Sequence, residues 1–206
     1  MSLKIIDISP TISRESAVWP GDKPFSRDVS LSQDSGHHLD LSSIDTTVHI
    51  GAHADAPNHF HPQGTGIDRV DLQAYIGPCY VHTVKKNKIE PEDCEVPLKQ
   101  NAPRILFRTL SCPDPNFFNK NFSYFTPEAV KFMGQNKVKL IGIDTPSVDE
   151  FSSKDLPSHR YLYEYNIRNL EGLVLDDVDD GIYELIALPL KIKDCDASPV
   201  RAVLIS

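Results

Sequence analysis

The sequence lacks the features that identify disulfide-rich, membrane-spanning and nucleic-acid-binding proteins. Its four cysteines form no Cys-x-x-Cys pair, so we expect reduced thiols in a cytoplasmic protein rather than disulfides or a zinc-thiolate site. No apolar run approaches the ~20 residues of a membrane-spanning helix, and the N-terminus does not resemble a secretion signal. With 21 basic and 29 acidic side chains the net charge is -8, which argues against nucleic-acid or anionic-membrane partners.

The composition indicates one globular domain spanning residues 1–206. Hydrophobic residues make up 40% of the 206 residues and charged residues 24%, as in an ordinary globular protein with a substantial core. A helix is predicted to begin with Thr126 as N-cap and Pro127 as its first residue, and a second with Ser158 as N-cap. Runs of branched apolar residues predict strands at 3–8, 79–84, 104–109, 138–143, 183–190 and 202–205.

Segment 49–61 is the most informative part of the chain because it holds four of the eight histidines. His49, His53, Asp55 and His59 follow the spacing His-x3-His-x-Asp-x3-His. Imidazole nitrogen and carboxylate oxygen are ligands of zinc, and also of manganese and iron. A single histidine usually has only a hydrogen-bonding role, but this concentration of histidines predicts a metal site.

The local backbone of this segment is predicted to be extended and then to turn. Pro57 argues against one continuous helix, because proline lacks an N–H and restricts the residue before it. We expect a strand over 46–49 that runs into a turn rich in glycine and alanine. If the chain is extended at His53 and Asp55, these two side chains share one face.

Three local ligands do not complete a metal site, so further ligands must come from elsewhere in the chain. Glu171 lies in an apolar stretch, where a buried carboxylate costs several kcal/mol unless it is paired or bound to a metal. His159 opens the second predicted helix, and we take it with Glu171 as the candidate to complete the site. Asp144 and Ser147 follow the 138–143 strand, at the end of a strand where α/β sites gather.

Two other side chains are candidates on weaker grounds. Trp19 is the only tryptophan and lies in the turn-rich segment 17–24. It is either a structural ring or a flat wall against an aromatic ligand. His61 is either exposed to solvent or a partner of the metal ligands.

The motifs resemble those of the cyclase-type metal-dependent hydrolases, and more narrowly the bacterial kynurenine formamidase branch of that family. The histidine segment carries the family resemblance, and the Val-Trp-Pro-Gly-Asp segment with the C-terminal half carries the narrower one. The matching stretches are 7–10, 18–22, 49–60, 71–78, 142–149, 171–177, 183–190 and 196–203.

The resemblance implies an α/β fold with a mixed, strongly curved, barrel-like sheet and helices outside it. It implies hydrolysis of the aryl formamide N-formyl-L-kynurenine at a site with two zinc ions, with manganese as the alternative, in a homodimer or larger homo-oligomer. His59 matches the general acid/base of the family, and Trp19 matches a substrate-contacting aromatic residue. The implied metal ligands are His49, His53, Asp55, His159 and Glu171, with Asp55 bridging the two ions.

One departure and two alternatives stay open on the sequence. Family members often carry a second histidine after the one matched by His159, and here Arg160 stands in that place. A related hydrolase of another aryl or cyclic amide would carry the same metal motif. A non-catalytic protein would hold its metal with four protein ligands and leave no position for water.

Overall fold

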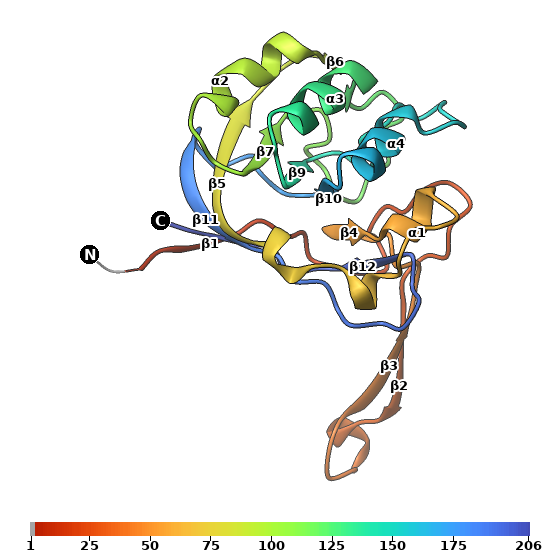
Figure 1. Cartoon of the computed structure of the whole chain (residues 1–206). Helices are drawn as coiled ribbons and strands as arrows, with labels where there is room; N and C mark the ends of the chain where they lie inside the picture. The colour runs from red at the N-terminus through yellow and green to blue at the C-terminus, as the bar shows by residue number, and fades with distance from the viewer. Residues whose placement is uncertain (1–2) are drawn as a thin grey trace.

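The computed structural model describes residues 3–206, and its centre is a strongly curved sheet of seven strands (Figure 1). From one edge to the other the strands are β1 (Ile5–Asp7), β13 (Val203–Ile205), β11 (Gly181–Ile186), β5 (Ile76–Thr83), β7 (Arg104–Arg108), β9 (Leu140–Ile143) and β10 (Arg168–Leu170). Neighbouring strands are antiparallel from β1 to β5 and parallel from β5 to β10. The expected α/β fold with a mixed, curved sheet is therefore confirmed.

A short strand beyond β10 carries the histidine segment. The backbone of His53, at the start of β4 (His53–Asp55), exchanges hydrogen bonds of 3.1 and 3.0 Å with Glu171, which directly follows β10. On its other side β4 pairs with β12 (Ala197–Pro199). This pairing brings the histidine segment to the carboxyl end of a parallel strand, where sites of α/β proteins gather.

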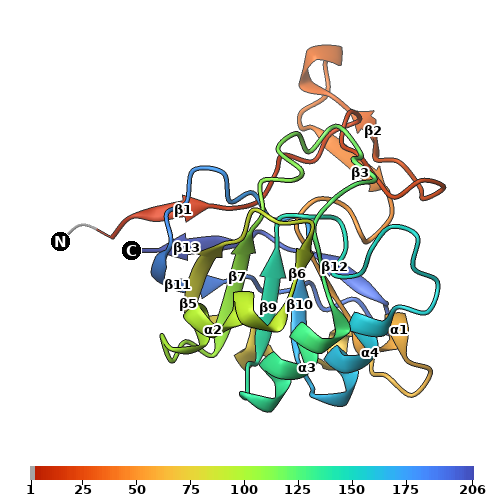
Figure 2. The ribbon, with the colours of Figure 1, turned by 90° about the horizontal axis from the view of Figure 1, so that it is seen from above.

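The parallel strands β7 and β9 are buried on both faces of the sheet, as β7 illustrates. Ile105 and Phe107 point into a cluster formed with the helices, whereas Leu106 points into the cluster on the opposite face. Figure 2 shows α2, α3 and α4 together along one side of the parallel strands. The helices are α1 (Pro57–Phe60), α2 (Glu95–Leu98), α3 (Pro127–Gln135) and α4 (Pro157–Glu164). Short 3-10 turns η1 (Gln33–Ser35), η2 (Ile67–Arg69), η3 (Leu72–Ala74) and η4 (Pro91–Cys94) and a small parallel pair, β6 (Lys88–Ile89) with β8 (Tyr124–Phe125), complete the elements.

One of the two predicted helix starts is confirmed and the other is wrong. The Thr126 side chain accepts a hydrogen bond from the Ala129 N–H at the start of α3, as an N-cap does. Ser158 is not the N-cap of α4 but lies inside the helix, where its hydroxyl donates to the carbonyl of Phe125. The first turn of α4 is capped instead by the carboxylate of Asp149, which no local sequence pattern predicts.

A hairpin of β2 (Ser26–Leu31) and β3 (Leu41–Asp45) projects away from the body of the molecule (Figure 1). The strand predicted over 46–49 is wrong, because β3 ends at Asp45 and the chain then bends. The Thr47 side chain explains the bend: its hydroxyl oxygen accepts a hydrogen bond from the His49 N–H, which competes with strand pairing.

Two features of the structure concern the membrane-spanning helices and the disulfides that the sequence argued against. Within residues 3–206 no helix has the length and apolar character needed to cross a bilayer. The four cysteines of that range are all free thiols.

Candidate metal centre

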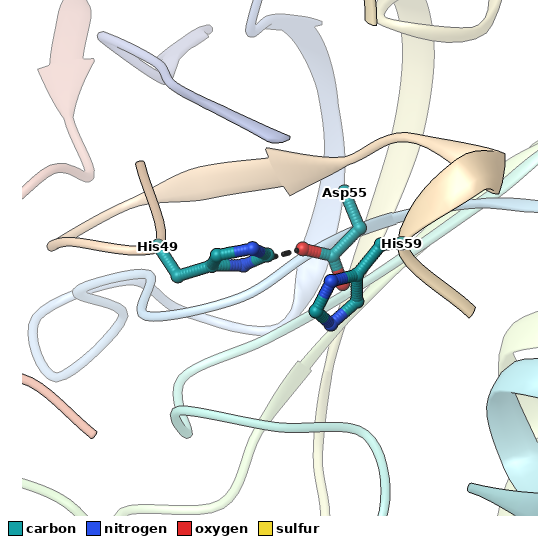
Figure 3. A group of neighbouring side chains, drawn as sticks. All are labelled: His49, Asp55 and His59. Carbon is teal, nitrogen blue, oxygen red and sulfur yellow. Dashed lines mark ion pairs between the residues drawn. The ribbon is translucent and has the colours of Figure 1, made fainter. Parts of the chain in front are cut away.

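The residues of the histidine segment form one cluster of side chains around Asp55. His53 and Asp55 lie on the same face of β4, as the extended chain predicts, with 3.7 Å between His53 Nε2 and Asp55 Oδ1. His49 comes from the preceding bend, and its Nδ1 lies 3.0 Å from Asp55 Oδ1. Figure 3 shows the rings of His49 and His59 close to each other and beside the Asp55 carboxylate, with the ion pair between His49 and Asp55 dashed.

Both distant candidates reach the same cluster. His159, in the first turn of α4, places Nε2 3.4 Å from Asp55 Oδ2 and 3.5 Å from Glu171 Oε1. The other oxygen of Glu171 lies 3.4 Å from His53 Nε2. Arg160 is exposed, whereas His159 is buried, so the missing second histidine leaves this cluster intact. The structure thus brings together all five predicted ligands, although the first and the last of them, His49 and Glu171, are 122 positions apart in the sequence.

A close backbone approach makes this arrangement possible. Gly172, directly after Glu171, has φ of +65°, and a Cβ at this position would lie 2.2 Å from the carbonyl oxygen of Gly51. Only glycine satisfies both conditions. The two backbones can therefore come close enough for Glu171 to face the histidine segment.

The donor atoms of this cluster fit a divalent metal. His53 Nδ1 lies 3.0 Å from the carbonyl of Gly51, to which it donates, so Nε2 carries the lone pair. His53 Nε2 and Asp55 Oδ1 are buried and take part in no well-aligned hydrogen bond. Buried polar atoms without partners are rare in folded proteins, and a shared cation would satisfy both. Two groups of potential ligand atoms, each within 4.8 Å, share Asp55: one is His49, Asp55 and His59, and the other is His53, Asp55 and Glu171.

The charges of the cluster are strongly coupled without a metal. Burial disfavours the charged form of His49, but the ion pairs with Asp55 and Asp196 outweigh it and raise the pKa of His49 to about 9. Burial likewise opposes the charge of Asp55, yet the His159 and His49 rings hold the pKa of Asp55 well below its usual value. The cluster therefore keeps its carboxylates ionised, and His49 carries a proton that a metal must displace.

His59 differs from the other histidines of the cluster. Its side chain is 32% exposed, and its ring centre lies 4.3 Å from that of His49. Burial, assisted by the nearby His49 and His159 rings, lowers the pKa of His59 against the opposing effect of Asp55. A neutral imidazole at the edge of the cluster is able to accept a proton.

Three residues that contact the cluster were not predicted from the sequence. Asp149 Oδ2 accepts a hydrogen bond of 2.7 Å from His159 Nδ1. Asn169 donates to both carboxylates, and Asp196 Oδ2 lies 2.9 Å from His49 Nε2. The partners of Asp196 and the Asp55 partner of Asn169 are more than a hundred positions away, and Asp149 is ten positions from His159 across a bend in the chain, so periodicity and spacing carry no signal for these contacts. Only the two-residue separation of Asn169 and Glu171 on β10 could have indicated that they share a face.

A cavity of about 520 Å³ opens above the cluster. Its walls include Trp19, Pro113 and Phe118, and its base includes His53, His159 and other residues of the cluster. The ring of Trp19 packs edge-on against Phe118, with 5.3 Å between ring centres, and against Phe122 and Phe151 behind it. The cavity lies within the ~300–1,000 Å³ range of small-molecule sites.

The remaining candidates, Asp144, Ser147 and His61, differ in whether they line the cavity. Asp144 and Ser147 line the cavity, and Asp144 accepts hydrogen bonds from the N–H groups of Thr109 and Leu110. This carboxylate therefore holds the turn from which the 111–123 cavity wall begins. His61 lies apart from the cavity and stacks on Tyr163, with 3.7 Å between ring centres.

Comparisons with known proteins agree with the fold and the motifs. The sequence profile of the cyclase family matches residues 6–150. Kynurenine formamidase of Polaromonas naphthalenivorans (strain CJ2) is 43% identical over 205 residues, which cover 98% of this chain and 91% of the relative. A Bacillus stearothermophilus protein described as a predicted metal-dependent hydrolase has 25% identity and a TM-score of 0.84, covering 100% of this chain and 99% of that chain. Isatin hydrolase A from Labrenzia aggregata, solved with benzyl benzoate, shares the fold with a TM-score of 0.84 at 24% identity, covering 98% and 93%. The resemblance expected from the motifs is confirmed.

Proposed function

Since this chain belongs to the cyclase family, we propose that it hydrolyses N-formyl-L-kynurenine to L-kynurenine and formate in tryptophan degradation. The observation that carries the proposal is the 43% identity with a kynurenine formamidase over 98% of the chain. The buried ligand cluster below an aromatic-walled cavity supports the same reaction. Formamide hydrolysis requires an activated water, and an aryl substrate requires an apolar wall.

The proposed enzyme binds two divalent ions, with zinc expected and manganese as the alternative. Asp55 is shared between the two positions. The support is the group formed by His53, Asp55 and Glu171, with the rings of His49 and His159 3.0 and 3.4 Å from the two oxygens of Asp55. His53 Nε2 and Asp55 Oδ1 are also buried without a well-aligned hydrogen bond. The proposed ligands are His49, His53, Asp55, His159 and Glu171.

When bound, a divalent metal supplies Lewis acidity, which polarises a carbonyl and lowers the pKa of water towards ~7. The residues of the chain do the remaining work. His59, neutral because its pKa is lowered, accepts the proton of the attacking water and delivers it to the departing aniline nitrogen. Trp19 lies along the cavity wall, where its ring contacts the aryl group and orients the formamide towards His59.

The activity is tested by measuring formate release from N-formyl-L-kynurenine with the zinc-loaded and the manganese-loaded protein. Isatin and formanilide complete the panel, because a cavity with an aromatic wall would also accept a fused lactam or a simple aryl formamide. We expect the highest kcat/KM for N-formyl-L-kynurenine. A preference for isatin would make the chain a cyclic-amide hydrolase, and no turnover of any substrate would leave a non-catalytic metal protein.

The role of His59 is tested by His59→Ala with His61→Ala as the matched control. Loss of a general acid/base typically lowers kcat about 10²–10⁴-fold. His59→Ala should show this loss with zinc content near that of the wild type, whereas His61→Ala should keep both, because His61 stacks on Tyr163 outside the cavity. Loss of zinc in His59→Ala would instead identify His59 as a ligand.

We also propose that the protein is a homodimer or larger homo-oligomer. The projecting β2–β3 hairpin supports this, because Val29 and Ile44, which the strand register places on one face, are 53% and 67% exposed on an element that stands apart from the core. Clustered exposed apolar side chains of this kind mark interaction surfaces. Light scattering after size exclusion should give a dimer or a larger assembly for the wild type and a smaller species for Ile44→Lys. The control Leu188→Lys, at an exposed position outside the hairpin, should assemble as the wild type does.

A further inference from the structure

Within residues 3–206, Asn169 is the one amide side chain that donates to both carboxylates of the candidate metal centre. It occupies the middle of β10 and is 1% exposed. Its Nδ2 donates to Asp55 Oδ2 at 2.7 Å and to Glu171 Oε1 at 3.1 Å. Both amide hydrogens are therefore used on the two carboxylates.

These hydrogen bonds distinguish the two oxygens of each carboxylate. A carboxylate offers about four lone-pair sites, two on each oxygen. Glu171 Oε1 accepts from Asn169 and also from the Val148 N–H at 3.0 Å, so both of its sites are taken. The other oxygen, Oε2, lies 3.4 Å from His53 Nε2 and is the one that Glu171 presents to an ion.

The same division holds for Asp55. Oδ2 accepts from Asn169 and lies 3.4 Å from His159 Nε2. Oδ1 is buried without a well-aligned hydrogen bond and lies between His49 and His53, at 3.0 and 3.7 Å from their nitrogens. The free lone pairs of both carboxylates therefore point to the same side of the cluster.

The two metal positions therefore differ in the number of protein ligand atoms that are available to them. The His53 position is defined by His53 Nε2, Asp55 Oδ1 and Glu171 Oε2, one of the groups whose ligand atoms lie within 4.8 Å of one another, and His49 can join it only after losing its proton. The His159 position has His159 Nε2 and the remaining lone pair of Asp55 Oδ2, because Glu171 Oε1 is already occupied. Since affinity rises with the number of available protein ligands, the first position should bind an ion more tightly.

We propose that Asn169 is a positioning residue that assigns one oxygen of each carboxylate to the His53 position, so that this position fills before the His159 position. The inference rests on the proposed metal-dependent function and deepens it, because it predicts the order of metal binding. Asn169 contacts the two carboxylates and is not among the residues that line the cavity, so it acts through Asp55 and Glu171. Residues that orient metal ligands typically contribute ~10–100-fold to metal affinity.

The test is a titration of the metal-free protein with Co²⁺ or Zn²⁺, followed by calorimetry and, for Co²⁺, by visible absorption. In the wild type we expect two equivalents, with the first bound at least about tenfold more tightly than the second. Asn169→Leu removes both donors, and the first equivalent should weaken about 10–100-fold because the two carboxylates are free to rotate. The cobalt spectrum of its first equivalent should change as well, because a different set of oxygens is presented.

Asn169→Asp is the second variant, and it keeps the size of the side chain. It frees a lone pair on Asp55 Oδ2 and on Glu171 Oε1 and adds a carboxylate beside them. The second equivalent should therefore bind at least about tenfold more tightly than in the wild type. The difference between the first and second metal affinities becomes smaller in both variants. In Asn169→Leu the first ion binds more weakly, and in Asn169→Asp the second ion binds more tightly. Either variant alone tests the proposal if the other does not fold.

The control is Leu170→Val, which alters the next residue of the same strand. Leu170 is fully buried and packs in the apolar core, so its variant perturbs β10 without touching the carboxylates. Both affinities should stay at their wild-type values. Equal affinities of the two ions in the wild type, or wild-type binding by the folded Asn169 variants, would overturn the proposal. Failure of the wild type to bind any metal would instead refute the proposed function itself.

Discussion

Replacing Asp149 by asparagine tests how much of the metal centre depends on the loop after β9. Asp149 Oδ2 accepts from His159 Nδ1 at 2.7 Å and from the His159 N–H at 3.1 Å, and Oδ1 accepts from the Ser158 N–H at 2.9 Å. An asparagine has one oxygen. If that oxygen keeps the Ser158 N–H, the amide NH₂ faces two donors of His159, and the imidazole must turn or exchange its proton.

Two effects of defined size follow from this geometry. Lost hydrogen bonds to a charged acceptor are worth about 1.5–3 kcal/mol each and are not additive, so Asp149→Asn should lower the free energy of unfolding by about 2–4 kcal/mol. At ~2–4 °C per kcal/mol for a chain of this size, Tm should fall by roughly 4–16 °C. Because His159 no longer presents Nε2, affinity for the ion beside it and kcat should each fall by about 10–100-fold.

Thermal denaturation, metal titration and steady-state kinetics measure these effects separately. Ser158→Ala is the matched control, since it removes the hydroxyl bond to Phe125 in the same helical turn while leaving the Asp149–His159 contact in place. It should lose some stability but keep metal affinity and kcat. If Asp149→Asn melts earlier than the wild type while metal affinity and kcat stay unchanged, Asp149 only caps α4 and the reasoning is refuted.

Three further predictions concern other parts of the molecule. Trp19→Leu should raise KM for the aryl formamide about tenfold with a smaller change in kcat, because it removes stacking area from the cavity wall. Steady-state kinetics measure both constants, and a fall in kcat with an unchanged KM would contradict this prediction. Arg104→Met should lower the free energy of unfolding by about 3 kcal/mol or more in a urea titration, because the buried guanidinium donates to the carbonyls of Gln73, Ala74 and Pro78; a loss below ~1 kcal/mol would contradict this. In the metal-free protein His49 carries a proton below its pKa of about 9, and zinc needs the lone pair. Apparent zinc affinity should therefore rise with pH up to about 9, with proton release seen by calorimetry in buffers of different ionisation enthalpy, and a flat profile would exclude His49 as a ligand.

The local parts of the structure could be predicted because their causes are local. The cap of Thr126 and Pro127 begins α3 as expected, since the groups that satisfy a helix start lie within a few residues. The pairing of His53 with Asp55 on one face follows from the two-residue period of an extended chain. The predicted N-cap Ser158 failed because a carboxylate nine positions away, on Asp149, satisfies that helix start in its place.

The sequence by itself determined the chemistry available to this protein: a histidine-rich segment with one carboxylate, a second histidine and a glutamate far along the chain, and a single tryptophan. Tertiary structure alone decided which atoms face one another, because β4 reaches Glu171 only through backbone pairing beside β10. It also brought Asn169, Asp149 and Asp196 into contact with Asp55, His159 and His49, respectively. Hydrogen bonds between residues more than a hundred positions apart leave no periodicity in the sequence, so their partners become visible only when the chain is folded.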